Sequence, residues 1–298
     1  MFRNVRFFRL EGDWPNSETA VSKRLSGSAF KPCGPLTERS SGWIAIDPDN
    51  DDALTRRVNG ADLLKLRSQS RVLPHAAIAE ELEVRIEEYQ SRMQEKPSAS
   101  EKRRMKAETR DELLPKAMLK SERILGYVDL KEKILAVDAA QETKAERFLL
   151  HLRAPFDDVQ IIPLQFGKPV GDLLNKIFFG NAPSRFALGR ECRMQDAADV
   201  GSKVRWTEFD LSDNSIRDHV ANGMRLTHLA IIYDNILSCV VDENGVLTKV
   251  RFLGMDDAGD EHPDDANAAL SRQDAEFVLM TGTLRHMLAD FRKLLGGS

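Results

Sequence analysis

The organisation of this chain is decided by residues 73–120, LPHAAIAEELEVRIEEYQSRMQEKPSASEKRRMKAETRDELLPKAMLK. In its first half, apolar residues recur at spacings of three and four, which places them on one stripe of a helix. They are Ile78, Leu82, Ile86, Tyr89 and Met93. The segment 96–100 breaks this pattern, and Ser98 followed by Glu101 has the spacing of a capping box for a second helix. The stretch therefore predicts two helices over 74–118, folded back on one another as an arm.

Segments typical of β-strands lie on both sides of this arm. Before it, Asn59-Gly60 predicts a hairpin with a return strand at 62–67, because a type I′ turn needs positive φ at both central residues. After it, 124–130 and 134–139 flank a short turn and predict a second hairpin. We therefore predict an α+β fold with a mixed or antiparallel sheet. Its central domain comprises residues 1–73 plus 119–166, and the arm is inserted in it.

Residues 167–298 predict a second α+β region, which would form the base of the molecule. Strands are expected at 226–233, 236–242 and 246–252, followed by an acidic loop at 256–265. A final helix is predicted from an apolar stripe that starts after Ser271 or Asp274. The stripe consists of Phe277, Met280, Leu284, Met287, Phe291 and Leu294. It could pack on the chain's own sheet, which we favour, or form a subunit contact.

The composition bounds the possible functions. The chain has 298 residues and a formal net charge of −4, which argues against a uniformly basic nucleic-acid coat, so any polyanion would have to be met by local patches. Cys33, Cys192 and Cys239 lie far apart and are expected to be reduced thiols of a cytoplasmic protein. The first residues lack the apolar run of a signal peptide, and no apolar stretch approaches the length of a membrane span. We expect a soluble protein without membrane association.

Motifs for catalysis are mostly missing from the sequence. It contains neither a Walker loop nor G-x-G-x-x-G, and its six histidines show no metal-binding spacing, so we expect no cofactor and no metal site. Asp129 and Lys131 have a spacing that holds Mg²⁺ in some nucleases. However, Lys131 falls in a predicted turn, and no second carboxylate stands at a convincing strand-end spacing. A metal-dependent nuclease is therefore the weaker alternative, and we expect a protein that is not an enzyme.

Basic residues concentrate on the second arm helix and at the two roots of the arm, whereas glutamates concentrate on the first arm helix. The basic group comprises Arg67, Arg71, Lys102, Arg103, Arg104, Lys106, Arg110, Lys116, Lys120 and Arg123. Two explanations are open. The helices could neutralise one another, at little energy per pair, or the basic groups at the arm's base could face phosphates. From the charges alone we favour neutralisation.

Six short motifs, in this order, resemble the recombination-associated protein RdgC family of proteobacteria. They are AFKPCG at 29–34, GW at 42–43, DALT at 52–55 with VNG at 58–60, VLP at 72–74, LLPKA at 113–117, and DAEFVLMTG at 274–282. The resemblance extends nearly from end to end. It implies a non-enzymatic protein that forms a ring-shaped homodimer around DNA. It also implies binding to single- and double-stranded DNA without sequence preference, antagonism of RecA filaments in homologous recombination, and association with the nucleoid.

The resemblance also implies roles for particular residues. Basic groups of the family correspond to Arg67, Arg71, Lys116 and Lys120, and together with Arg123 these are the predicted phosphate contacts. Dimer contacts are predicted at Met118 near the arm, and at Phe277 and Met280 in the last helix. A scaffold that binds protein through the arm, without affinity for DNA, is the remaining alternative.

Overall fold

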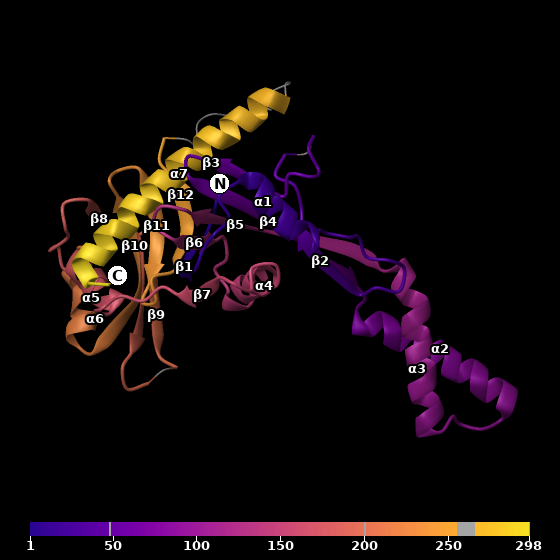
Figure 1. Ribbon diagram of the computed structural model, residues 1–298. Helices are drawn as coiled ribbons and strands as arrows, with labels where there is room; N and C mark the ends of the chain where they lie inside the picture. The colour runs from indigo at the N-terminus through magenta and orange to yellow at the C-terminus, as the bar shows by residue number, and fades with distance from the viewer. Residues whose placement is uncertain (48, 200, 255–265, 298) are drawn as a thin grey trace.

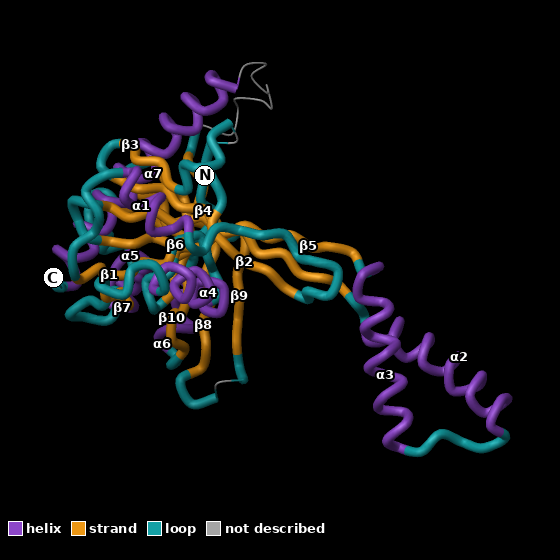
Figure 2. The backbone as a smooth tube through the Cα atoms, turned by 45° about the vertical axis from the view of Figure 1, so that its right-hand side comes forward, coloured by secondary structure: helices purple, strands orange, loops and turns teal. Residues whose placement is uncertain are grey.

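The structure, a computed structural model, describes residues 1–47, 49–199, 201–254 and 266–297. It has an α+β fold built from two curled antiparallel sheets and seven α-helices within these ranges. Figures 1 and 2 show a compact body from which a pair of helices projects far to one side. The predicted acidic loop at 256–265 lies outside the described residues.

The first sheet has seven strands in the order β2-β4-β5-β6-β1-β7, with β3 paired to β4. These strands are β1 (Arg6–Glu11), β2 (Arg39–Trp43), β3 (Thr55–Val58), β4 (Ala61–Val72), β5 (Met118–Asp129), β6 (Ile134–Val137) and β7 (Gln160–Pro163). Both predicted hairpins are confirmed, and Asn59 and Gly60 have φ values of 49° and 75°. Strands β4 and β5 are longer than predicted, because their outer halves are polar and carry no apolar alternation.

The inserted arm is confirmed as two helices, α2 (His75–Met93) and α3 (Ala99–Leu113). A 3₁₀ turn, η1 (Leu114–Lys116), leads from α3 into β5. Ser98 forms the predicted capping box: its backbone N–H donates to Glu101 Oε2 at 2.8 Å, and the Glu101 N–H donates to Ser98 Oγ at 3.3 Å. Both helices of the arm therefore begin and end where local sequence signals place them.

The capping box gives a pH-dependent prediction. Hydrogen bonds from Ser98 and Tyr89 lower the pKa of Glu101 to about 2, from an ordinary value of 4.5. Because the folded pKa is depressed, the cap stabilises the helix start above about pH 4.5, and this stabilisation is lost as the pH falls towards 2. The Ser98 amide proton shift in an NMR titration should have its midpoint near pH 2. Glu101→Gln should abolish that inflection, whereas a midpoint near 4.5 would contradict the capping box.

One face of the first sheet is covered by α1 (Glu18–Ser26) and α4 (Glu142–Arg153), around a core that includes Trp43 and Phe148. Ser17 caps α1, and its hydroxyl accepts from the Ala20 N–H at 3.1 Å. A Cβ at Gly126 of β5 would lie 2.4 Å from Phe148 Cζ. The close approach of α4 to the sheet thus requires glycine at this position.

The second sheet has the order β12-β11-β10-β8-β9. Its strands are β8 (Phe186–Asp196), β9 (Lys203–Thr207), β10 (Met224–Tyr233), β11 (Leu237–Asp242) and β12 (Leu247–Phe252). Three helices, α5 (Val170–Phe178), α6 (Asn214–Ala221) and α7 (Ala266–Leu295), supply apolar side chains to the core on one face of this sheet. Strand β8 was not predicted, because two register shifts interrupt its alternation.

The last helix packs on the chain's own core, as we favoured from the sequence. Its stripe, from Phe277 to Phe291, lies in the cluster that joins the second sheet to β4 and β5. Helix α7 begins at Ala266, earlier than predicted. Among the helices of the described ranges, none has the length and apolar character needed to cross a membrane.

Candidate nucleic-acid interface

Strands β4 and β5 continue beyond the body as a ribbon that carries the arm (Figure 2). Side chains alternate between the two faces of a strand, so the register decides which residues share a face. Arg67 lies directly opposite Arg123, while Lys120 lies opposite Ser70. One face of the ribbon therefore carries Arg67 and Arg123, and Lys120 lies on the other.

Three cations gather on the first of these faces, and no carboxylate of the described residues neutralises them. Lys65 lies two residues before Arg67 in β4 and shares its face with Arg67 and Arg123. Within the described ranges, none of the three forms a salt bridge. Burial lowers the pKa of Lys65, and the neighbouring Arg123 guanidinium lowers it further. Like charges directly across a strand pair destabilise a sheet, so this arrangement favours a bound anion.

Arg67 is held in place by uncharged groups. Its guanidinium carbon lies 4.7 Å from the centroid of the Phe30 ring, and Nη2 donates to Ser121 Oγ at 3.3 Å. Both contacts leave its positive charge unneutralised. Phe30 is in turn fixed against β2, because its N–H donates to the Trp43 carbonyl at 2.8 Å. We call the face formed by Lys65, Arg67 and Arg123 the ribbon face. Its Arg67 side chain is held in position before any ligand binds.

Arg71, a predicted phosphate contact, donates hydrogen bonds to backbone carbonyls at the root of the arm. Its Nη1 donates to the carbonyls of Leu114, Pro115 and Ala117 at 3.2, 3.0 and 3.2 Å. Its Nη2 donates to the Gly34 carbonyl at 3.1 Å. The guanidinium therefore fastens the returning end of the arm to β4 and to the loop before β2. Its Nη groups are engaged by backbone oxygens in this structure, and a phosphate contact by Arg71 stays a prediction.

Lys116 and Lys120 are exposed but do not join the ribbon face. Lys116 lies in η1, and Lys120 lies on the opposite face of the ribbon. Further along that opposite face, Glu122 forms ion pairs with Lys144 and with Arg147, the latter at 2.9 Å. The structure thus brings Arg67 and Arg123 together and leaves the other three predicted cations apart.

The residues that we predicted as dimer contacts differ in their exposure to solvent. Met118 is 80% exposed and lies opposite Val72, which is 46% exposed, so the arm root carries an exposed apolar pair. Phe277 and Met280 are only 5% and 1% exposed because they belong to the chain's own core. In the single chain they leave almost no free area for a subunit contact, and their role as dimer contacts stays a prediction.

Asp129 also proves to be structural. Its Oδ1 accepts from the N–H groups of Lys131 and Glu132, both at 3.0 Å, and its Oδ2 accepts from Arg285 Nε at 2.7 Å. The side chain thus closes the β5–β6 turn and ties it to α7. Lys131 lies in that turn, so the two residues do not form the strand-borne pair that the nuclease alternative requires. Within the described ranges, no three His, Cys, Asp or Glu residues are grouped so that they could hold a metal ion.

Sequence reasoning missed two parts of the basic surface. The first part is Lys65, which the sequence could have indicated, because residues two apart in a strand, such as Lys65 and Arg67, point to the same face. The second part is a basic face on the second sheet, where Arg193 lies directly opposite Arg205. It is formed by Arg190, Arg193, Lys203, Arg205, Lys249 and Arg251. These residues come from three strands, so only the register brings them together.

Comparisons with known proteins give one consistent result. The family described as "Putative exonuclease, RdgC" matches the chain over residues 1–298. A recombination-associated protein RdgC of Yersinia enterocolitica is 29% identical over 297 residues, covering 99% of this chain and 98% of the relative. Proteins of the same name from Yersinia pestis and Yersinia pseudotuberculosis are also 29% identical, over 298 residues.

Proposed function

The chain belongs to the RdgC family, and on this premise we propose that it binds DNA through phosphate contacts without reading the bases. One observation supports the proposal above others: the ribbon face gathers Lys65, Arg67 and Arg123 without a carboxylate among the described residues. A phosphate that binds between these three unpaired cations reduces the electrostatic repulsion among them. Phosphate contacts give affinity and position but no sequence information.

We further propose that two copies form a ring around DNA. In such a ring the basic faces point inward and acidic residues point outward, which reconciles a net charge of −4 with binding to a polyanion. The exposed pair of Met118 and Val72 at the arm root supports one subunit contact. Light scattering should give the mass of a dimer, and a closed DNA circle should be bound more slowly than a linear fragment. A monomeric mass would end the ring proposal.

The biological role follows from occupation of DNA. A ring on single- or double-stranded DNA competes with RecA filaments for the same phosphates, so we propose that this nucleoid-associated protein restrains RecA-dependent recombination in the cytoplasm. A scaffold that binds only protein would fail to shift DNA in a gel titration.

Neutralising the ribbon face should weaken DNA binding irrespective of sequence. Each lost contact on duplex DNA reduces the log–log salt slope by about 0.9. Arg67→Ala combined with Arg123→Ala should therefore reduce the slope by about 1.8 and the affinity at 0.1 M salt by several tens of fold. Fluorescence anisotropy on two unrelated 40-bp duplexes measures both quantities.

A matched control for this experiment lies on the arm. Lys102→Ala with Lys106→Ala removes the same charge from exposed positions of α3, and should change the slope by much less. The ribbon variant itself should keep its folding stability within about 1 kcal/mol, since the pair it removes is repulsive. Equal losses in the two variants would show that net charge, and not the ribbon face, governs binding.

The family is described as a putative exonuclease, so nuclease activity is the property to assay directly. We propose that the chain binds DNA without cleaving it, because Asp129 is fully engaged by Arg285 and by the turn. Labelled single- and double-stranded DNA should stay intact with Mg²⁺ or Mn²⁺. Cleavage that persists through purification and is lost in an inactive point variant would reverse this proposal.

A further inference from the structure

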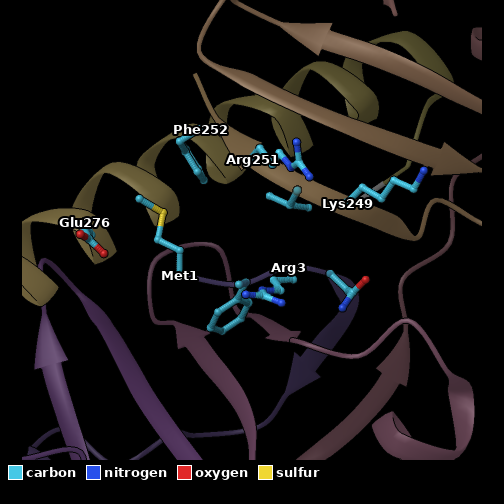
Figure 3. Close-up of a pocket in the computed structure, with 9 residues that line it drawn as sticks. Met1, Arg3, Lys249, Arg251, Phe252 and Glu276 are labelled. Atoms are coloured by element: carbon cyan, nitrogen blue, oxygen red, sulfur yellow. The ribbon is translucent and has the colours of Figure 1, made fainter. Parts of the chain in front are cut away.

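A cleft lies between the N-terminal segment and the edge of the second sheet. Its volume is about 690 Å³, and its walls include Arg3, Lys249 and Arg251. In Figure 3, β12 places Lys249 and Arg251 on one side, and the N-terminal segment places Arg3 on the other. The two segments are fixed relative to each other, because the Val250 N–H donates to the Arg3 carbonyl at 2.9 Å and the Val5 N–H to the Leu247 carbonyl at 2.8 Å.

The charge in this cleft is predominantly positive. Arg3 and Arg251 are exposed, and neither side chain forms an ion pair within the described ranges. Among the described residues of the lining, Glu276 is the one carboxylate, and it is paired with Arg272 at 3.4 Å. The guanidinium groups of Arg3 and Arg251 can therefore bind an anion without first breaking an internal salt bridge.

Lys249 is presented by an unusual backbone. Its φ is +53°, a left-handed conformation that a residue with a Cβ rarely adopts. The β11–β12 register shifts at this place, between Ser238 and Val240. A bulge of this kind re-aims a side chain, and here the Lys249 amino group crosses β11 and β10 to reach the Glu191 carboxylate on β8.

Glu191 anchors this arrangement. Its side chain is 8% exposed, and besides Lys249 it contacts Arg205 at 2.9 Å and Arg193 at 3.6 Å. Burial by itself would raise the pKa of Glu191, but the bonds from Lys249 and Arg205 outweigh it and hold the pKa below its ordinary value. One carboxylate therefore holds three cations, each of which keeps 40–49% of its side chain exposed to solvent.

A second hollow adjoins the cleft on the exposed face of the sheet. It has a volume of about 300 Å³, and its lining includes the small residues Gly189, Ala230 and Ser238. A Cβ at Gly189 would lie 2.7 Å from Ala230 Cβ, so the floor requires glycine there. Lys249 and Arg251 line both hollows. The two hollows thus share these two cations, and the lining of the second also contains Arg190 and the carboxylates of Glu191 and Glu208.

We propose that Arg3, Lys249 and Arg251 form a phosphate-binding subsite for the DNA backbone, distinct from the ribbon face, in which Glu191 is a positioning residue for Lys249. This inference rests on the proposed DNA-binding function and extends it to a second surface. The subsite recognises the phosphodiester charge, so single strands and duplexes of any sequence are its ligands.

The subsite is tested by removing its two free guanidinium groups. Arg3→Ala with Arg251→Ala should reduce the salt slope on a 40-bp duplex by about 1.8 and weaken binding at 0.1 M salt by several tens of fold. The matched control is Lys23→Ala with Lys176→Ala, exposed positions on α1 and α5 that lie away from both basic faces. The control should bind like the wild type. A subsite variant that also does so would overturn the proposal.

The role of Glu191 is tested by whether Glu191→Gln strengthens or weakens DNA binding. Glu191→Gln adds one positive charge, so a pure charge effect would tighten DNA binding. If Glu191 positions Lys249, the variant should instead bind several-fold more weakly, and Glu191→Asp should restore part of the loss. Unchanged or tighter binding by folded Glu191→Gln would remove its positioning role.

The outcomes for the two basic surfaces are distinguishable. Loss of affinity in the ribbon variant but not in the subsite variant would overturn only the subsite. Failure of the wild type to bind DNA would end both proposals.

Discussion

Replacing Asp62 by alanine should lower the free energy of unfolding by about 3–5 kcal/mol, because it leaves the Arg57 guanidinium, whose side chain is only 21% exposed, without its carboxylate partner. The Asp62 side chain is fully buried and accepts from Arg57 Nε at 2.6 Å, Arg57 Nη2 at 2.7 Å and Trp14 Nε1 at 2.7 Å. The hydrogen bonds that Arg57 donates to the Asp62 carboxylate in turn raise the pKa of Arg57. Arg57 also donates to the Pro15 carbonyl at 2.9 Å, so the network fastens the segment before α1 to the β3–β4 hairpin.

Urea unfolding followed by circular dichroism at one fixed protein concentration measures this loss. The control is Asp158→Ala, which removes an ion pair with Arg24 whose side chains are 48% and 39% exposed. An exposed pair of this kind contributes at most about 1 kcal/mol. If Asp62→Ala cost no more than Asp158→Ala, the buried network would not be the link between the hairpin and α1.

Replacing Arg71 should loosen the root of the arm. Arg71→Ala removes charge-assisted hydrogen bonds to four backbone carbonyls, of Gly34, Leu114, Pro115 and Ala117. Single bonds of this type contribute about 1.5–3 kcal/mol, so the variant should lose about 3 kcal/mol of stability. Hydrogen–deuterium exchange should accelerate over 114–118, while the helical turns at the far end of the arm stay protected.

The charge-preserving variant separates the two roles that Arg71 could have. Lysine keeps the charge but cannot reproduce the planar guanidinium fork, so Arg71→Lys should loosen the arm root nearly as much as Arg71→Ala. Arg110→Ala is the matched control, since Arg110 pairs with Glu38 at the same root and both side chains are about half exposed. Protection in Arg71→Lys equal to the wild type would return Arg71 to the phosphate ligands.

The elements that the sequence predicted well are those whose signals lie within a few residues. The capping box of Ser98 and Glu101 and the Asn59-Gly60 turn each satisfy backbone groups locally, so neither needs tertiary contacts to be recognised. The apolar stripe of α7 also predicted its helix correctly, because its spacing matches the period of an α-helix.

The misses share a physical cause. The outer halves of β4 and β5 are paired with each other over polar residues, so they lack the alternation that marks a half-buried strand. In β8, register shifts break the alternation around Gly189. Arg71 could not be distinguished from Arg67 in sequence, because both are strand arginines near the arm. Only the backbone of η1 and the ring of Phe30 give them different partners.

By itself, the sequence determined the family, the inserted arm, both hairpins of the first sheet and the apolar stripe of α7. Each of these features depends on residues close together in the chain or on motifs in a fixed order. Only the tertiary structure decided which cations share a face. Strand register sets Arg67 against Arg123 and Arg193 against Arg205, and a left-handed Lys249 reaches Glu191 across two intervening strands. Charge in a sequence is a sum, whereas an anion is bound by charges that the fold places within a few ångströms of one another.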